Sequence, residues 1–119
     1  MAWKEPKVGE LSSRIRIERV SEVSDGVGGF STEWTPVLTS AAKIAPTKGG
    51  EEIRADRRLG IENVEITIPF SRSALTIRHS DRAIDVRTGK TYNIGWSGDL
   101  AGSQRYIVIE AQAGGLTDG

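Results

Sequence analysis

The alternation of apolar and polar residues is the feature that most constrains how this chain can fold. It is clearest in the segment Val64–Phe70, which reads Val-Glu-Ile-Thr-Ile-Pro-Phe. Successive side chains of a β-strand point to opposite faces, so this segment predicts a strand with one buried and one solvated face. We therefore expect the core to be built from strands.

Five further segments have the character of strands. The six expected strands cover residues 11–20, 30–44, 64–70, 82–87, 91–96 and 105–111. Pro36 falls within the second segment, where a proline suits a sheet edge or a bulge. Six strands joined by hairpins in 119 residues favour a small barrel or sandwich, and closure removes exposed edges. The predicted fold is mainly β, a small antiparallel β-barrel of about six strands.

A long insertion is predicted between the second and third strands, at about residues 45–61. It begins with turn-forming residues, and Glu51–Leu59 then places acids first and bases last, an order that complements a helix dipole. Only Ile53 and Leu59 could pack, so we expect a long loop or a short helix. The predicted organisation is an N-terminal arm over 1–10, a single barrel domain over 11–112 and a flexible tail over 113–119.

A glycine-rich tip is expected between the first two strands. Its key residues are Asp25, Gly26, Gly28 and Gly29. Glycine reaches positive φ at little steric cost, which suits a tight connection. A phosphate loop would need Lys followed by Ser or Thr, or a helix after the glycines, whereas here Phe30 begins a strand. The sequence therefore predicts a mobile loop and not a ligand cradle.

Charge and cysteine content argue against several classes of protein. The chain has 16 basic and 16 acidic residues, unlike a protein whose main task is to neutralise phosphates. It has no cysteine, which rules out disulfides and thiolate-bound zinc. The N-terminus does not have the pattern of a signal peptide, and no apolar stretch approaches the roughly 20 residues of a membrane span. We expect no membrane partner.

Few residues carry the chemistry of an active site. The only histidine, His79, lies in a polar segment and is interpreted as a surface residue and not as part of a catalytic triad. Asp81 and Asp85 would lie roughly 13 Å apart along a strand, too far to share an ion. Glu51 and Glu52 are interpreted as complementing a helix start. We expect no enzymatic activity, no metal and no cofactor.

Arginine and aromatic residues raise the question of nucleic acid. Arg54, Arg57 and Arg58 form a local basic cluster, which we interpret as a solvated or intersubunit face. A stacking platform needs exposed aromatic side chains in line, but most of them fall at inward phases of the predicted strands, which favours the core. The aromatic residues are Trp3, Phe30, Trp34, Phe70, Tyr92, Trp96 and Tyr106. The predicted barrel core is Val64, Ile66, Ile68, Tyr92, Ile94, Ile107 and Ile109.

Several short motifs follow one another in an order that is more specific than any one of them. They are Gly9–Leu11, Arg14–Ile17, Asp25 with Gly28–Gly29, Trp34, Ala42–Pro46, Gly50–Glu52, Asp81–Arg82 and Gly89–Ile94. In this order they resemble the head–tail joining proteins, also called head closure or stopper proteins, of tailed bacteriophages and related gene transfer agents. The resemblance covers roughly Gly9 to Ala111. The chain departs from it at Pro69–Phe70, where the family often has Arg-Tyr.

The resemblance implies a structural virion component that forms a homo-oligomeric ring, commonly twelvefold. The ring would join portal or adaptor proteins on the head side to tail or tail-terminator proteins on the other side, and would retain packaged DNA. The implied location is the neck of a virion or phage-like particle, with assembly in the host cytoplasm. The insertion would project into the channel or onto a neighbouring ring, where its charges would make nonspecific contact with DNA. Its candidate contact residues are Glu51, Glu52, Arg54, Arg57 and Arg58.

Two other functional classes compete with this one, and the residues leave the first of them open. The strand count and the arginine cluster would also suit an oligonucleotide- or oligosaccharide-binding barrel, which salt-dependent binding of single-stranded DNA by the monomer would favour. A small hydrolase would need more than one histidine or a close carboxylate pair, and the sequence offers neither.

Overall fold

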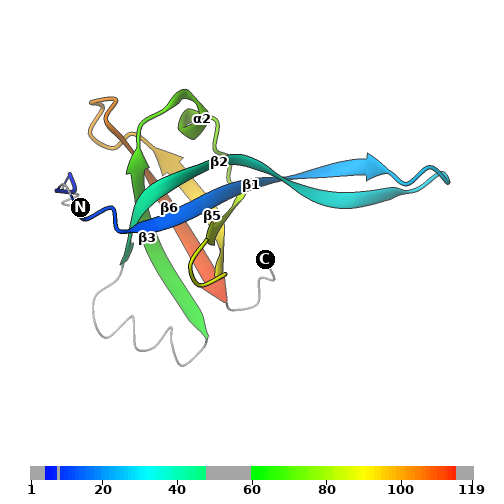
Figure 1. Cartoon of the computed structure of the whole chain (residues 1–119), viewed down its shortest axis with the longest axis horizontal. Helices are drawn as coiled ribbons and strands as arrows, with labels where there is room; N and C mark the ends of the chain where they lie inside the picture. Colours follow the sequence, from blue (N-terminus) through cyan, green and yellow to red (C-terminus); the bar gives the residue numbers. More distant parts are fainter. Residues whose placement is uncertain (1–4, 8, 48–59, 115–119) are drawn as a thin grey trace.

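Alternating apolar residues form the six strands of the protein, shown in Figure 1. The computed structural model describes residues 5–7, 9–47 and 60–114. All strand pairs are antiparallel, and hydrogen bonding runs around a closed barrel in the order β1-β2-β3-β6-β5-β4. The predicted fold class is therefore confirmed. The elements are β1 (Ser13–Ser24), β2 (Phe30–Pro46), β3 (Ile61–Pro69), α2 (Arg72–Leu75), β4 (Arg82–Asp85), β5 (Thr91–Gly98) and β6 (Tyr106–Gly114).

The barrel interior is filled by aliphatic side chains at alternate positions. Ile66 of β3 lies in register between Ile44 of β2 and Ile109 of β6, and it is fully buried. Close packing of these aliphatic side chains stabilises the fold, because it removes their apolar surface from water. The seven residues predicted as core are all buried and belong to one cluster: Val64, Ile66, Ile68, Tyr92, Ile94, Ile107 and Ile109.

A short helix and its following loop cover one end of the barrel, at the top of Figure 1. The Ser71 side chain caps α2 by accepting a hydrogen bond from the Ala74 backbone N–H at 3.0 Å, as helix N-caps commonly do. Ala74 and Ile77 are buried in the core cluster. The segment expected only as a long connection between strands therefore also closes the barrel.

Several element boundaries differ from those expected. β1 continues to Ser24 because β2 supplies a partner along its whole length. β6 continues to Gly114, inside the expected tail, because β3 begins early enough to pair with Ala113 and Gly114. At the start of the expected insertion, β2 extends to Pro46, which pairs with Val64.

Within the described ranges, no helix has the length and apolar character that a membrane span requires.

Pro36 lies at a bulge, as expected. The register of β1 with β2 shifts between Ile17 and Glu18, and Glu18 pairs with Pro36 while Ile17 pairs with Leu38. One extra residue, Val37, is thereby accommodated in β2. β2 pairs with β3 only from Lys43 onward, so Pro36 also lies on a strand edge where its missing N–H costs no ladder bond.

The prediction that most aromatic residues belong to the core is wrong, because among the described aromatic residues only Tyr92 lies in the core cluster and only Phe70 packs against it. Phe30 is 72% exposed and Trp96 is 43% exposed, whereas Tyr92 is buried. Phe30 begins β2 in a part of the hairpin that has no core beside it. A bulge between Ile94 and Trp96 shifts the register of β5 against β6, so Trp96 pairs with the outward-facing Glu110. Alternation across the bulge therefore fails to predict its face.

The described N-terminal residues cross the outside of the sheet. Glu5 forms an ion pair with Arg105 at 3.1 Å, and Glu10 forms one with Lys43 at 3.3 Å. Between these anchor points Pro6 is buried. Thr67 and Val108 form an outward cross-strand pair and are nevertheless buried. We interpret the N-terminal segment as the cover of this outward pair.

Candidate functional site

The hairpin of β1 and β2 extends well beyond the barrel, toward the right of Figure 1. β4 pairs with β1 between Ile15 and Glu18. Beyond Glu18 the two hairpin strands pair, among the described residues, only with each other. We call residues 19–35 the arm. Six strand residues on each side of its tip give a projection of roughly 20 Å. Isolated two-stranded hairpins are marginally stable in water, so something must support the arm at its base.

The glycine-rich loop forms the tip of the arm. Gly26 and Gly28 have φ values of 82° and 87°, which explains the need for glycine at these two positions. The Asp25 carboxylate accepts hydrogen bonds from the backbone N–H groups of Val27 at 2.8 Å and Gly29 at 3.0 Å. The expected position of the loop is confirmed, and its mobility stays a prediction.

We expect nucleotides to leave the melting temperature of the protein unchanged. A phosphate would need free backbone N–H groups, and Asp25 already occupies two of them with a negative charge. Gly28→Val should cost about 1–3 kcal/mol because a β-branched residue is strained at positive φ. Thermal shift with a nucleotide panel checks this, with the exposed Val27→Ala as the matched control. Nucleotide stabilisation that Gly28→Val alone abolishes would contradict this interpretation.

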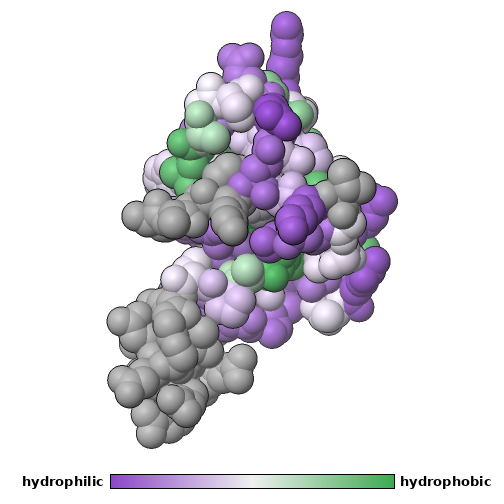
Figure 2. All heavy atoms as spheres, turned by 90° about the vertical axis from the view of Figure 1, so that its left-hand side faces the viewer, coloured by the Kyte–Doolittle hydropathy of each residue, from purple (hydrophilic) through white to green (hydrophobic). Residues whose placement is uncertain are grey.

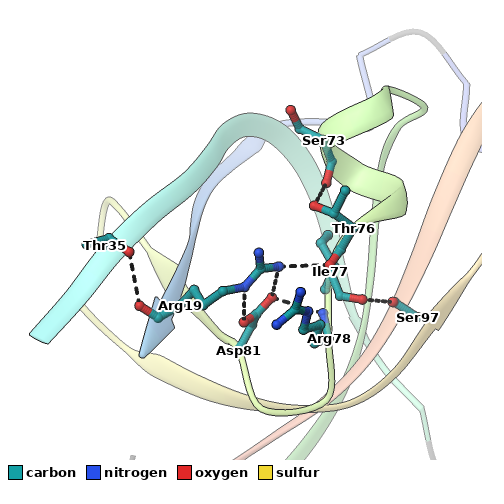
Figure 3. Close-up of polar contacts among 8 residues, drawn as sticks. All are labelled: Arg19, Thr35, Ser73, Thr76, Ile77, Arg78, Asp81 and Ser97. Atoms are coloured by element: carbon teal, nitrogen blue, oxygen red, sulfur yellow. Dashed lines mark hydrogen bonds and ion pairs between the residues drawn. The ribbon is translucent and has the colours of Figure 1, made fainter. Parts of the chain in front are cut away.

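An ion pair holds the inner side of the arm's base, as Figure 3 shows. The Arg19 guanidinium donates to both oxygens of the Asp81 carboxylate, each at 3.0 Å, and to the Thr76 carbonyl at 2.8 Å. The Arg78 backbone N–H donates to the same carboxylate at 2.9 Å. The Asp81 side chain is completely buried. This pair ties the arm to the loop that closes the barrel, and Ser97 of β5 donates to the Ile77 carbonyl of the same loop.

A second ion pair holds the outer side of the base. The Glu18 carboxylate accepts hydrogen bonds from Arg82 at 2.7 and 2.9 Å and from Arg16 at 2.7 Å. The Arg82 guanidinium also lies 3.9 Å from the centroid of the Trp34 ring, a cation–π geometry. Burial raises the pKa of Glu18, but the hydrogen bonds from Arg82 and Arg16 outweigh it, so its pKa lies below the ordinary value. The stabilisation from Glu18 is therefore lost only in acid, below pH 4.5.

The two ion pairs are reciprocal, because consecutive residues of β1 meet consecutive residues of the other segment. Glu18 binds Arg82, and Arg19 binds Asp81. Glu18 and Arg19 point to opposite faces of the strand, so ion pairs hold the base of the arm on both faces. We call these two ion pairs the clamp. Sequence reasoning noted Asp81–Arg82 only as a motif and missed this clamp. Both dipeptides place an acid before a base, and antiparallel pairing of such dipeptides matches unlike charges. This shared order was the available signal, but spacing alone did not pair them.

The other predicted site residues lie apart from this clamp. The insertion residues Glu51, Glu52, Arg54, Arg57 and Arg58 lie outside the described residues. His79 is exposed in a turn, as expected. Asp85 accepts from the backbone of the next turn and does not join Asp81 in a common site. Among the described residues, no group of three His, Asp or Glu side chains could hold a metal ion.

A groove of about 550 Å³ lies over the β3-β6-β5 part of the sheet. Three amide residues in register, Asn63, Gln112 and Asn93, form its polar row. Glu110 is the only ionisable residue among the described residues of its lining. The groove therefore offers hydrogen bonds but no nucleophile with an adjacent base.

The surroundings of Glu65 disfavour the ionised form of its carboxyl group. Partial burial and the facing carboxylate of Glu110 raise the pKa of Glu65. Glu65→Gln should therefore raise the free energy of unfolding at neutral pH by roughly 0.2–1 kcal/mol, the scale of cross-strand pairs. A group with a raised folded-state pKa destabilises at high pH, so the gain should vanish below pH 4.5, where the wild-type carboxyl is protonated. Urea unfolding at several pH values checks this, with the exposed Glu33→Gln as control; equal gains for both variants would contradict it.

Comparison with known proteins agrees with this architecture. The chain matches the model of the phage head completion protein family over residues 6–114. A Shigella flexneri 2a protein solved in solution is similar with a TM-score of 0.67 and 23% identity, over 94% of this chain and 100% of that one. A chain in the virion of a native gene transfer agent particle is similar with a TM-score of 0.56 and 17% identity, over 84% and 91%. No curated protein matches the chain.

The two solved structures show that the chain shares their fold, and the family model shows to which family the chain belongs. Its match extends from the N-terminal segment across every strand of the barrel to the last residue of β6. The chain belongs to the phage head completion protein family.

Proposed function

We propose that this protein is a structural subunit of the head–tail junction, where copies form a ring beneath the portal, close the filled head and receive the tail. The observation that carries the proposal is the family match over the whole described barrel. Membership in that family makes the protein a structural, head-related component of a phage or phage-like particle. The ring, its commonly twelvefold symmetry and its position in the neck are the finer part of the proposal.

The form of the molecule supports a role in assembly. A closed barrel leaves few free edges, so contacts between subunits depend on what projects from it. The projecting element is the arm, and two ion pairs hold its base. An arm whose base is fixed to the barrel by two ion pairs is suited to a defined contact with a neighbouring subunit.

The surface of the arm gives little support to the oligonucleotide-binding alternative. Phe30 is the most exposed aromatic residue of the described chain, and its arm carries the acidic residues Glu22, Asp25 and Glu33. No Lys or Arg occurs from Val20 to Ala42. Such a surface repels phosphates instead of attracting them.

Deletion of the gene in a producing host tests the proposed function. We expect heads that fill with DNA but lose it, and free tails that do not attach, as seen by electron microscopy and nuclease protection of packaged DNA. Addition of the purified protein to the lysate should restore joined, nuclease-resistant particles. Joined particles that retain DNA without the protein would overturn the proposal. Salt-dependent binding of single-stranded DNA by the monomer would favour the alternative.

A further inference from the structure

Beyond Arg19 at its base, the arm combines exposed apolar side chains with negative charge alone. Val27 at the tip is 87% exposed and Phe30 is 72% exposed. Cross-strand pairing of Ser24 with Phe30, and of Glu22 with Thr32, puts Glu22 on the same face as Phe30. The Glu22 carboxylate forms no ion pair with another residue in the described part of the chain. A solvent-exposed aromatic ring on the same face as such a carboxylate is typical of a surface that docks on a partner.

The loop and helix at the top of the barrel present the opposite combination. Leu75 of α2 is 57% exposed, and Arg72, three residues earlier, lies on the same side of the helix. Arg78 follows in the adjoining loop and is exposed, and no acidic residue occurs from Pro69 to Ser80. Neither guanidinium forms an ion pair with another described residue. We call residues 71–80 the cap.

The cap and the arm therefore both have exposed apolar side chains, and their charges are opposite. Each has an exposed apolar side chain next to uncompensated charge, negative on the arm and positive on the cap. The arm cannot fold back onto the cap of its own chain, because the clamp holds its base and it points away from the barrel. The side of the molecule opposite the arm, seen in Figure 2, is largely hydrophilic with small separate apolar spots.

Pairing of strand edges is a poorer explanation of the arm. Pro36 and the bulge at Val37 interrupt the free edge of β2 close to the base. Proline and bulges are devices that prevent edge-to-edge association. The contact is thus expected through side chains and not through an extended sheet.

We propose that the arm of one copy docks on the cap of the next copy, with Phe30 against Leu75 and Glu22 facing Arg72 and Arg78. This contact is heterologous, because the two surfaces differ, and repetition of such a contact gives a ring or an open filament. The proposal rests on the proposed ring and names the surfaces that build it. The cap adjoins the base of its own arm, through the bond from Arg19 to the Thr76 carbonyl. Each docked arm therefore rests beside the base of the following one.

Charge reversal in the full chain tests the contact. Sedimentation velocity over a range of concentrations would compare wild type with an arm variant, Glu22→Lys, and a cap variant, Arg72→Glu/Arg78→Glu. We expect each variant to self-associate about tenfold more weakly or worse, and association of wild type to fall with salt. A mixture of the two variants should associate again, because each arm then finds a cap of opposite charge. The matched control, Arg14→Glu/Arg87→Glu, changes two exposed arginines elsewhere and should behave as wild type.

A covalent test does not depend on charge. The chain has no cysteine, so Phe30→Cys/Leu75→Cys introduces the only thiols. Oxidation should give a ladder of disulfide-linked copies if these positions approach within the roughly 7 Å that a disulfide allows between Cα atoms. Phe30→Cys/Val86→Cys, which uses an exposed residue outside the cap, should remain mostly monomeric.

Three results would overturn the contact: association unaffected by arm and cap reversal, a mixture that stays dissociated, or equal disulfide ladders for both cysteine pairs. A wild-type chain that remains monomeric at millimolar concentration and gives no ladder would overturn it as well. None of these results bears on whether the protein joins heads to tails, which the gene deletion decides separately.

Discussion

Replacement of Asp81 by alanine is expected to lower the free energy of unfolding by about 3 kcal/mol. The change removes a fully buried carboxylate that satisfies both Arg19 and the Arg78 backbone N–H. Loss of one partner of a buried ion pair typically costs roughly 3–5 kcal/mol because the other charge stays behind. The lower end of that range applies because the Arg19 side chain keeps 26% of its surface exposed. Denaturant unfolding measures the loss.

A double-mutant cycle separates the pair from its surroundings. Arg19→Ala/Asp81→Ala should recover part of the loss, since no orphaned guanidinium remains. The exposed pair of Lys90 with Glu62 is the matched control, and Glu62→Ala should cost at most about 1 kcal/mol. If Asp81→Ala lowered the free energy of unfolding no more than Glu62→Ala does, the Arg19–Asp81 pair would contribute no more to stability than an exposed ion pair.

Ile66→Ala should cost roughly 2–5 kcal/mol, because Ile66 is fully buried between strands that cannot close on the space it leaves. Small domains have a total stability of roughly 5–15 kcal/mol, so the variant would be severely weakened. The midpoint of urea unfolding reports the change, with an unchanged slope if unfolding stays two-state.

Two substitutions calibrate that result. Ile66→Val removes one methylene and should cost about 0.5–1.5 kcal/mol. Val86→Ala, at a position 43% exposed, should stay within about 0.5 kcal/mol of wild type. A midpoint for Ile66→Ala equal to that of wild type would mean that this face of β3 does not form the core.

The barrel core could be predicted from sequence because alternation is a local signal. Each inward residue of β3 and β6, and of β5 before its bulge, is separated from the next by one outward residue. The geometry of a strand converts that spacing into a face. Another local signal predicted the glycine-rich tip, because the freedom to adopt positive φ at Gly26 and Gly28 is a property of single residues. It also placed Pro36 at a bulge on an edge.

Local signals failed where the environment of a strand changes along its length. β1 alternates through Ser24, but beyond Glu18 no barrel lies beside it, so Val23 is 38% exposed. A single bulge reversed the face of Trp96. Neither the end of the core nor the site of a bulge in β5 is encoded in a periodicity.

The sequence by itself determined the fold class, the seven predicted core residues and the loop that ends the arm, because propensity and alternation act between neighbours in the chain. Only the tertiary structure decided that Arg19 meets Asp81 and Glu18 meets Arg82, across 62 and 64 residues. Closure of the barrel brings β4 beside β1, and that pairing sets the two ion pairs in register. Pairings of this kind depend on which strands become neighbours, a property of the whole fold that no local spacing contains.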